Sequence, residues 1–149
     1  MKRTKPPFRA DQVGSLLRPA RLHKARADRA AGVISAADLK AVEDEEIVKV
    51  IARQQEIGLE GITDGEFRRA YWHFDFLERL DGVTSVDGDS GMNFKGGVGV
   101  AKALRITGTI GYGSEHPMVE HFRFLAANTK KMPKMTIPGP SMLHYRGGR

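Results

Sequence analysis

The sequence predicts an α/β fold in which helices alternate with short parallel strands. A long helical pattern ends at a glycine and is followed at once by a strand, and later strand-like segments are separated from it by further helical patterns. Of the 149 residues, 40% are hydrophobic, as in one soluble globular domain. A barrel of eight such units typically needs about 250 residues. We therefore expect the chain to hold about half of a (β/α)8 barrel.

The first expected elements are a short strand and a helix. The apolar segment 12–17 predicts the strand. Pro19 suits the first turn of the following helix, because its missing N–H would be unpaired there. This helix carries Leu22 and Ala25 and should end near Gly32, which tolerates a positive φ.

The second helix has the clearest pattern in the chain. The Ser35 hydroxyl can accept a backbone N–H at its start, while Asp38 lies in the positive first turn. Helical spacing of apolar side chains then continues to Gly58. Residues 59–64 follow as a short strand, so helix, glycine and strand form one α/β unit.

The remaining elements are less regular. We expect helices over residues 70–80 and from Pro117, and a strand over the alternating residues 101–107. Residues 82–100 contain six of the 17 glycines, which predicts a flexible insertion loop. Residues 134–137 are predicted to form the last strand, with no covering helix after it.

The composition excludes several classes of protein. The chain has no cysteine, so it contains no disulfide, thiolate zinc site or cysteine nucleophile of its own. No apolar run approaches the roughly 18 residues that span a bilayer, and no secretory signal is evident, so we expect no membrane association and a cytoplasmic location.

The positive charge is concentrated near the amino terminus. The whole chain carries +6, whereas residues 1–31 contain nine Lys or Arg and two Asp. Such a segment can attract an anionic partner or simply form the solvated face of a helix. Because aromatic residues are not interleaved with these charges, the pattern does not favour nucleic-acid binding.

Chemistry in a parallel α/β sheet is carried by side chains just beyond the carboxyl ends of strands. Three clusters of polar residues and glycines are expected at such positions. They are residues 13–15, 64–66 and 138–141.

These clusters resemble, in order and spacing, the cobalamin-independent methionine synthase family, especially its short single-barrel members. Residues 13–19 have the sequence VGSLLRP, residues 63–69 have TDGEFRR and are followed by Trp72, and residues 137–142 have IPGPSM. The second block is the most specific of the three. The resemblance implies that residues 1–149 are a partial catalytic domain, the amino-terminal half of a (β/α)8 TIM-type barrel with a Gly-rich insertion.

The resemblance implies a fragment of a zinc-dependent methyltransferase, which moves a methyl group from a methyltetrahydrofolate-type donor to the thiolate of homocysteine. Zinc keeps a thiol deprotonated at neutral pH, and the thiolate is the nucleophile. The family's zinc ligands are a His, two Cys and a Glu from the carboxyl half of the barrel. No metal ligand is identified among residues 1–149, so we expect this chain alone to be inactive.

The resemblance also implies roles for particular residues. It places Glu66 opposite the ammonium group of the amino acid substrate and Ser15 opposite its carboxylate. Asp64 is a weaker candidate, with the alternative role of accepting backbone N–H groups in its own loop. The full set of substrate-binding candidates is Gly14, Ser15, Asp64 and Glu66, with Tyr145 and Arg146 as weak candidates on the folate side.

Several alternatives stay open from the sequence. Glu66 could instead form an ordinary ion pair with Arg68 or Arg69, and Trp72 and Phe76, at helical spacing, are expected in the core. The chain could also be a non-catalytic half-barrel module for binding or assembly, forming a homo-oligomer through exposed sheet edges. A third alternative is a related zinc-dependent thiol alkyltransferase with another acceptor thiol.

Overall fold

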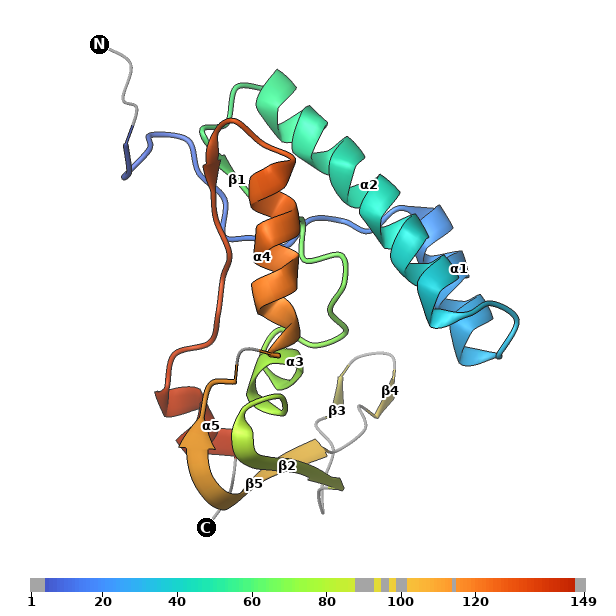
Figure 1. Cartoon of the computed structure of the whole chain (residues 1–149), viewed down its shortest axis with the longest axis vertical. Coiled ribbons are helices and arrows are strands. Elements are labelled where there is room, and N and C mark those ends of the chain that lie inside the picture. The colour runs from blue at the N-terminus through green and yellow to red at the C-terminus, as the bar shows by residue number, and fades with distance from the viewer. Residues whose placement is uncertain (1–4, 88–92, 95–96, 99–101, 114, 147–149) are drawn as a thin grey trace. The chain divides into compact units, whose positions relative to one another are not determined.

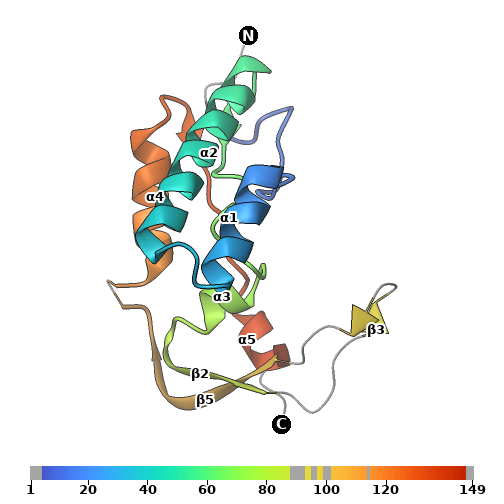
Figure 2. The ribbon, with the colours of Figure 1, turned by 90° about the vertical axis from the view of Figure 1, so that its right-hand side faces the viewer.

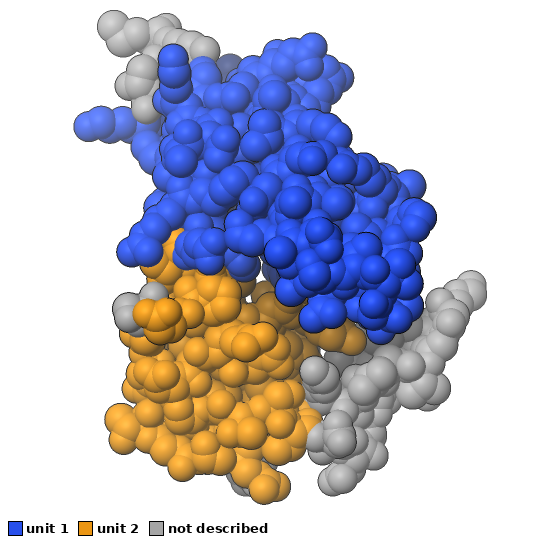
Figure 3. All heavy atoms as spheres, turned by 45° about the vertical axis from the view of Figure 1, so that its right-hand side comes forward, with its two compact units in different colours: residues 1–69, 120–136 blue, residues 70–119, 137–149 orange. Residues whose placement is uncertain are grey.

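The computed structural model describes residues 5–87, 93–94, 97–98, 102–113 and 115–146 (Figure 1). The chain forms two compact units, which are coloured separately in Figure 3. Unit 1 comprises Met1–Arg69 and Glu120–Thr136, and unit 2 comprises Ala70–Val119 and Ile137–Arg149.

Unit 1 contains a parallel ladder of two short strands. β1 (Gly61–Ile62) pairs with β6 (Met132–Pro133), with Gly61 opposite Met132. Backbone bonds extend the pairing at both ends, from the Met132 N–H to the Glu60 carbonyl at 3.1 Å and from the Lys134 N–H to the Ile62 carbonyl at 2.8 Å. The predicted α/β class is therefore confirmed, whereas the half-barrel stays a prediction.

Three helices accompany this ladder. α1 (Ala20–Ala30) packs along α2 (Ala36–Glu56), as Figure 2 shows. α2 leads into β1. α4 (Pro117–Ala127), which belongs to unit 1 from Glu120 on, leads into β6. Among the described residues, no helix is both long enough and apolar enough to cross a membrane. The apolar core of unit 1 consists of Leu22, Ile47, Ile51, Ile62, Phe67 and Leu125.

The predicted start of α2 is confirmed. The Asp38 backbone N–H donates to the Ser35 hydroxyl at 3.1 Å, and the Ser35 N–H donates to the Asp38 carboxylate at 2.9 Å. These reciprocal bonds form a capping box. The predicted ends are confirmed too, since Gly32 and Gly58 follow α1 and α2 with φ of 73° and 88°.

Replacing Ser35 with Ala is expected to lower the free energy of unfolding by about 1 kcal/mol, because a helix amide loses its cap. Urea denaturation followed by circular dichroism measures this change. Lys24→Ala is the control, because it removes only the exposed pair between Lys24 and Asp28 on α1. Equal midpoints for Ser35→Ala and the parent chain would contradict the expected role of the cap.

Unit 2 is built on an antiparallel pair of strands. β2 (Asp81–Asp87) pairs with β5 (Lys102–Gly111), and β3 (Asn93–Phe94) pairs with β4 (Gly97–Val98). The prediction of a strand over residues 101–107 is confirmed from Lys102 on, and the strand continues beyond the predicted end to Gly111; residue 101 lies outside the described residues. The predicted loop over residues 82–100 is wrong at its start, because Val83 is buried and pairs with Ile106 inside the β2–β5 ladder.

The rest of the predicted insertion loop is only partly described. β3 and β4 are described, whereas residues 88–92, 95–96 and 99–101 lie outside the described residues. The prediction that this segment is flexible therefore stays a prediction.

Two short helices complete unit 2, and both differ from the prediction. α3 (Phe74–Leu77) is shorter than the expected helix over residues 70–80, because the Asp75 carboxylate accepts the backbone N–H groups of Ala70 and Tyr71 ahead of it. α5 (Ser141–Arg146) follows the last strand, where no helix was predicted. It contributes Leu143 to the core of unit 2, whose other members are Phe74, Phe76, Leu77, Val83 and Leu104.

The structure corrects three further predictions. Residues 12–17 form no strand; instead, the Thr63 hydroxyl donates to the Gly14 carbonyl at 2.8 Å and the Leu16 N–H to the Gly65 carbonyl at 3.0 Å. The last strand lies just before residues 134–137, because its partner β1 has only two residues. Phe76 is buried as predicted, whereas Trp72 is 47% exposed.

Candidate functional site

The candidate site lies at the carboxyl end of the parallel ladder in unit 1. Asp64 and Glu66 follow β1, and Thr136 follows β6. The Gly14 backbone lies close to the residues that follow both strands. A Cβ atom placed on Gly14 would lie 2.6 Å from Glu66 Oε1 and 2.9 Å from Thr136 Oγ1. Strand ends of this kind are where parallel α/β proteins bind ligands.

Glu66 has an unusual backbone. Its φ is 56°, and among the described residues it is the one non-glycine with a positive φ. A glutamate in this region carries strain of about 1–3 kcal/mol and persists only where surrounding contacts hold it. Its N–H donates to Asp64 Oδ1 at 2.9 Å. The alternative structural role predicted for Asp64 is therefore confirmed.

The Glu66 carboxylate is largely enclosed. Its side chain is 9% exposed and forms an ion pair with Arg69, so the predicted alternative of a pair with Arg68 or Arg69 holds for Arg69. Burial raises the pKa of the Glu66 carboxyl, and Asp64 adds to this effect. Arg69, a hydrogen bond from Ser15 and the charge of Arg18 act in the opposite direction.

Replacing Gly14 with Ala is expected to move the Glu66 carboxylate, because the new methyl group would occupy its space. The carboxylate is the end of a flexible side chain, so it should turn toward water. Its raised pKa should then return toward the ordinary value of 4.5. A 13C NMR titration of the glutamate carboxyl carbons measures this change.

Gly108→Ala is the matched control, since a Cβ there would meet nothing closer than Gly82 Cα at 3.7 Å. It should leave the Glu66 titration unchanged. An unaltered Glu66 pKa in Gly14→Ala would contradict the close packing of Gly14 on Glu66.

A buried network of hydrogen bonds holds Thr63, the residue just before Asp64. Sequence reasoning missed this network. Gln54 exchanges two hydrogen bonds with the Thr63 backbone, at 2.8 and 3.0 Å. The Gln12 side-chain amide donates to the Thr63 hydroxyl at 2.7 Å, and the same hydroxyl accepts the Gly65 N–H at 3.2 Å. The one signal in the sequence was Gln54 itself, a polar residue within the apolar stripe of α2.

Sequence reasoning also missed two arginines. Arg18 and Arg26 belong to the basic amino-terminal segment, for which a solvated helix face was one interpretation. Both are instead partly buried and donate to backbone carbonyls of residues 66–69. This part of the positive charge therefore serves the interior of unit 1.

The remaining candidates belong to unit 2. The backbones of Tyr145 and Arg146 lie in α5, but their side chains are outside the described residues. Ser141 begins the same helix. The structure therefore brings Gly14, Ser15, Asp64 and Glu66 together. The substrate-binding roles of these residues, like those of Tyr145 and Arg146, stay predictions.

The described residues do not fit a metal site. No group of three or more His, Cys, Asp or Glu side chains among them is placed to hold a metal ion. The complete chain also has no cysteine. The zinc that the resemblance implies therefore finds no ligand set in the described part of the chain.

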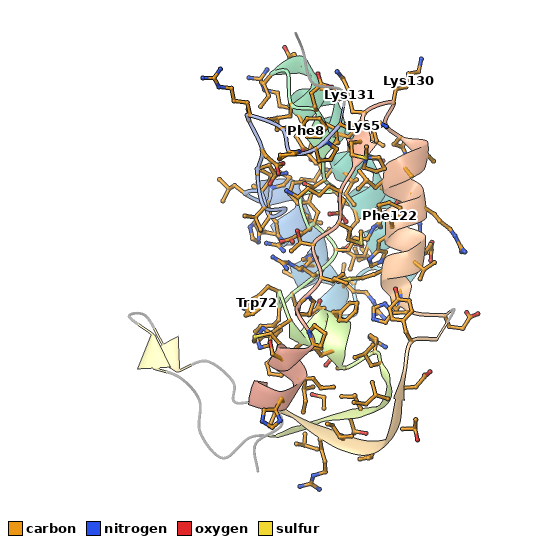
Figure 4. All side chains as sticks on the ribbon, turned by 90° about the vertical axis from the view of Figure 1, so that its left-hand side faces the viewer. Lys5, Phe8, Trp72, Phe122, Lys130 and Lys131 are labelled. Carbon is orange, nitrogen blue, oxygen red and sulfur yellow. The ribbon has the colours of Figure 1, made fainter. Side chains whose placement is uncertain are left out.

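A hollow of about 390 Å³ lies at the opposite, amino end of the ladder. Glu60 and Lys131 precede β1 and β6 there, and the two Glu60 oxygens lie 2.9 and 2.8 Å from Lys131 Nζ. Figure 4 shows Phe8, Lys130 and Lys131 at this end of unit 1. Glu60 and Lys131 neutralise each other, so this pair adds no net charge to the hollow.

The fold and the site together define an α/β domain with a buried carboxylate at a strand end. A sequence model of the family described as "Cobalamin-independent synthase, Catalytic domain" matches residues 8–144. The chain belongs to this family, the cobalamin-independent methionine synthases, as its motifs predicted.

Individual relatives agree with this assignment. The uncharacterised protein YxjG of Bacillus subtilis (strain 168) is 49% identical over 148 residues, which are 99% of this chain and 39% of YxjG. A solved structure from Listeria monocytogenes, described as a candidate vitamin-B12-independent methionine synthase, has a TM-score of 0.77 and 45% identity, covering 95% of this chain and 39% of that one. The chain thus spans about two fifths of the length of these relatives.

A more distant relative carries a functional name. The 5-methyltetrahydropteroyltriglutamate–homocysteine methyltransferase of Synechococcus sp. (strain JA-2-3B'a(2-13)) is 30% identical over 145 residues, which are 94% of this chain and 18% of that protein.

Proposed function

We propose that this chain supplies the amino acid-binding part of a methyltransferase whose acceptor is homocysteine and whose donor is a methyltetrahydrofolate. Membership of the family and the name of the Synechococcus relative support this reaction class. The observation that carries the proposal is the buried Glu66 carboxylate beside Gly14 and Ser15. These are the residues for which the family resemblance implies contact with the amino acid.

The proposed binding mode follows from charge. Glu66 accepts hydrogen bonds from the acceptor's ammonium group, which takes over from Arg69 as the nearest cation. The Ser15 hydroxyl, which bonds to Glu66 in this structure, is free to turn toward the acceptor's carboxylate when the ammonium arrives. Asp64 keeps the loop in shape through its bond from the Glu66 N–H.

Activation of the thiol is assigned to residues outside this chain. Zinc would supply a thiolate at neutral pH, but the described residues provide no ligand set for it. The contribution of this chain is therefore to bind and orient the amino acid end of the acceptor. The cytoplasmic location and the self-association through sheet edges stay predictions.

The test compares the 149-residue chain with a chimera in which it is joined to the remaining part of YxjG. The chain alone is expected to bind no stoichiometric zinc after dialysis against a weak chelator and to transfer no methyl group. The chimera is expected to bind zinc, to bind homocysteine in a calorimeter and to methylate it.

Two results would overturn the proposal. One is stoichiometric zinc in the 149-residue chain, which would mean that a ligand set exists here. The other is a folded, zinc-loaded chimera that fails to bind homocysteine. A chimera that prefers another thiol, such as cysteine, would retain the reaction class and correct the acceptor.

A further inference from the structure

Two arginines from outside the site hold the backbone that carries Glu66. Arg18 Nη2 donates to the Glu66 carbonyl at 2.7 Å and to the Arg69 carbonyl at 2.9 Å. Arg26 Nη1 donates to the Arg69 carbonyl at 3.0 Å, and its Nη2 donates to the Phe67 carbonyl. Two guanidinium groups therefore bind three carbonyls within four consecutive residues.

The arginines are themselves well anchored. Arg18 directly precedes Pro19 at the start of α1, and Arg26 lies within α1. Arg26 Nη2 also lies 3.4 Å from Glu43 Oε1 on α2, and the Glu43 side chain is only 11% exposed. The carbonyls of Glu66, Phe67 and Arg69 are thus tied to α1 and the residues that lead into it, and through Arg26 and Glu43 to α2.

This arrangement explains how Glu66 keeps its strained backbone. A positive φ at a glutamate is unfavourable unless neighbouring contacts enforce it. Hydrogen bonds from a guanidinium group are stronger than neutral ones, and its planar, rigid arrangement of N–H groups fixes the direction of each carbonyl that it binds. Arg18 binds the carbonyls of both Glu66 and Arg69. These bonds fix the position of the Glu66 backbone and therefore the direction in which its side chain leaves it.

We propose that Arg18 and Arg26 are positioning residues, which set the Glu66 carboxylate in place for the ammonium group of the acceptor. The inference rests on the proposed function, because it assumes that Glu66 binds that ammonium. Neither arginine touches the acceptor. Lysine does not replace Arg26, because a single ammonium group lacks the fork whose two Nη atoms bind the Arg69 and Phe67 carbonyls. At Arg18 one Nη2 binds two carbonyls, and lysine lacks the planar group that directs these two N–H bonds.

The test uses Arg18→Lys in the chimera and compares two thiols. Homocysteine carries the ammonium group, whereas 4-mercaptobutanoate has the same chain without it. Arg18→Lys is expected to weaken homocysteine binding about tenfold, and to change 4-mercaptobutanoate binding by less than about twofold. If Arg18 only stabilised the fold, Arg18→Lys would weaken the binding of both thiols equally.

Controls separate positioning from stability and from the proposed function. Arg53→Lys alters an exposed pair with Glu56 and should change neither affinity. Arg26→Lys is the second variant, for use if Arg18→Lys fails to fold. Glu66→Gln in the same chimera tests the function itself. If Glu66→Gln weakens homocysteine binding and both lysine variants leave it unchanged, the positioning role is wrong and the function stands. If Glu66→Gln leaves homocysteine binding unchanged, the proposed function is wrong, and the positioning role that rests on it is wrong too.

A local measurement in the 149-residue chain completes the test. The Arg69 N–H donates to the Glu66 carbonyl at 3.4 Å, within the segment that Arg18 holds. Amide hydrogen exchange over residues 66–69 should become faster in Arg18→Lys, with no change in α2. Unchanged exchange in this segment would contradict the proposal.

Discussion

Replacing Arg68 with Met is expected to lower the free energy of unfolding by about 3 kcal/mol, the lower end of the range for removing one partner of a buried ion pair. The Arg68 side chain is 6% exposed and lies 2.5 Å from Asp44 and 3.6 Å from Glu43. Its guanidinium carbon also lies 5.0 Å from the centre of the Phe124 ring. Arg68 therefore joins α2, α4 and the loop after β1 within unit 1.

The loss of unfolding free energy should stay near the lower end of this range, because the carboxylates of Glu43 and Asp44 keep other cationic partners. Arg26 remains 3.4 Å from Glu43, and Lys40 remains 3.0 Å from Asp44. Burial raises the pKa of Glu43 even with both arginines in place. Removing Arg68 should raise the pKa of Glu43 further, because one compensating charge is lost.

Thermal and urea denaturation measure the change, with Arg53→Met as the control. Arg53 forms a pair with Glu56 in which both side chains are about two thirds exposed, at 66% and 67%. Such a surface pair contributes about 0–1 kcal/mol, so this variant should be close to the parent chain. If both variants lost the same free energy of unfolding, the burial of Arg68 would add nothing to its contribution to stability.

Local sequence patterns predicted the helices of unit 1 better than its strands. The capping box at Ser35 and the glycines that follow α1 and α2 act within a few residues, so their effect is visible in the sequence. β1 and β6 have two residues each and are paired across 71 positions. Such short strands have almost no alternating pattern, which is why their bounds were misplaced.

The site shows the same division between local and distant contacts. Gly14, Ser15, Asp64 and Glu66 could be predicted as candidates because they lie within recognisable motifs, while their contact with a substrate stays a prediction. The bonds from Arg18 to the Glu66 and Arg69 carbonyls connect residues 48 and 51 positions apart. Their acceptors are backbone atoms, which carry no residue identity, so no motif could reveal them.

The second large effect concerns Glu66→Gln, which keeps the shape of the side chain and removes its charge. In the chimera with the remaining part of YxjG, this change is expected to weaken homocysteine binding by about 1.5–3 kcal/mol, the range for hydrogen bonds to charged groups. Calorimetric titration with homocysteine measures it. Binding of 4-mercaptobutanoate should change little, because that thiol has no ammonium group to lose.

Fold stability should respond differently, and the sign follows from the pKa. Burial raises the pKa of Glu66 above its ordinary value of 4.5, so the folded chain holds this proton more tightly than the unfolded chain. The contribution of Glu66 to stability therefore falls as the pH rises from about 4.5 through the raised pKa. Glutamine has no such proton, and its carbonyl oxygen can still accept from Arg69.

Glu66→Gln should accordingly be about as stable as the parent chain at pH 7, with a smaller decline of stability above pH 4.5. Denaturation curves across this pH range give the comparison. A stability loss at pH 7 as large as the expected binding loss, with homocysteine affinity unchanged, would assign Glu66 a different role. It would then be a structural carboxylate for Arg69, and the charge at this strand end would serve the fold rather than the acceptor.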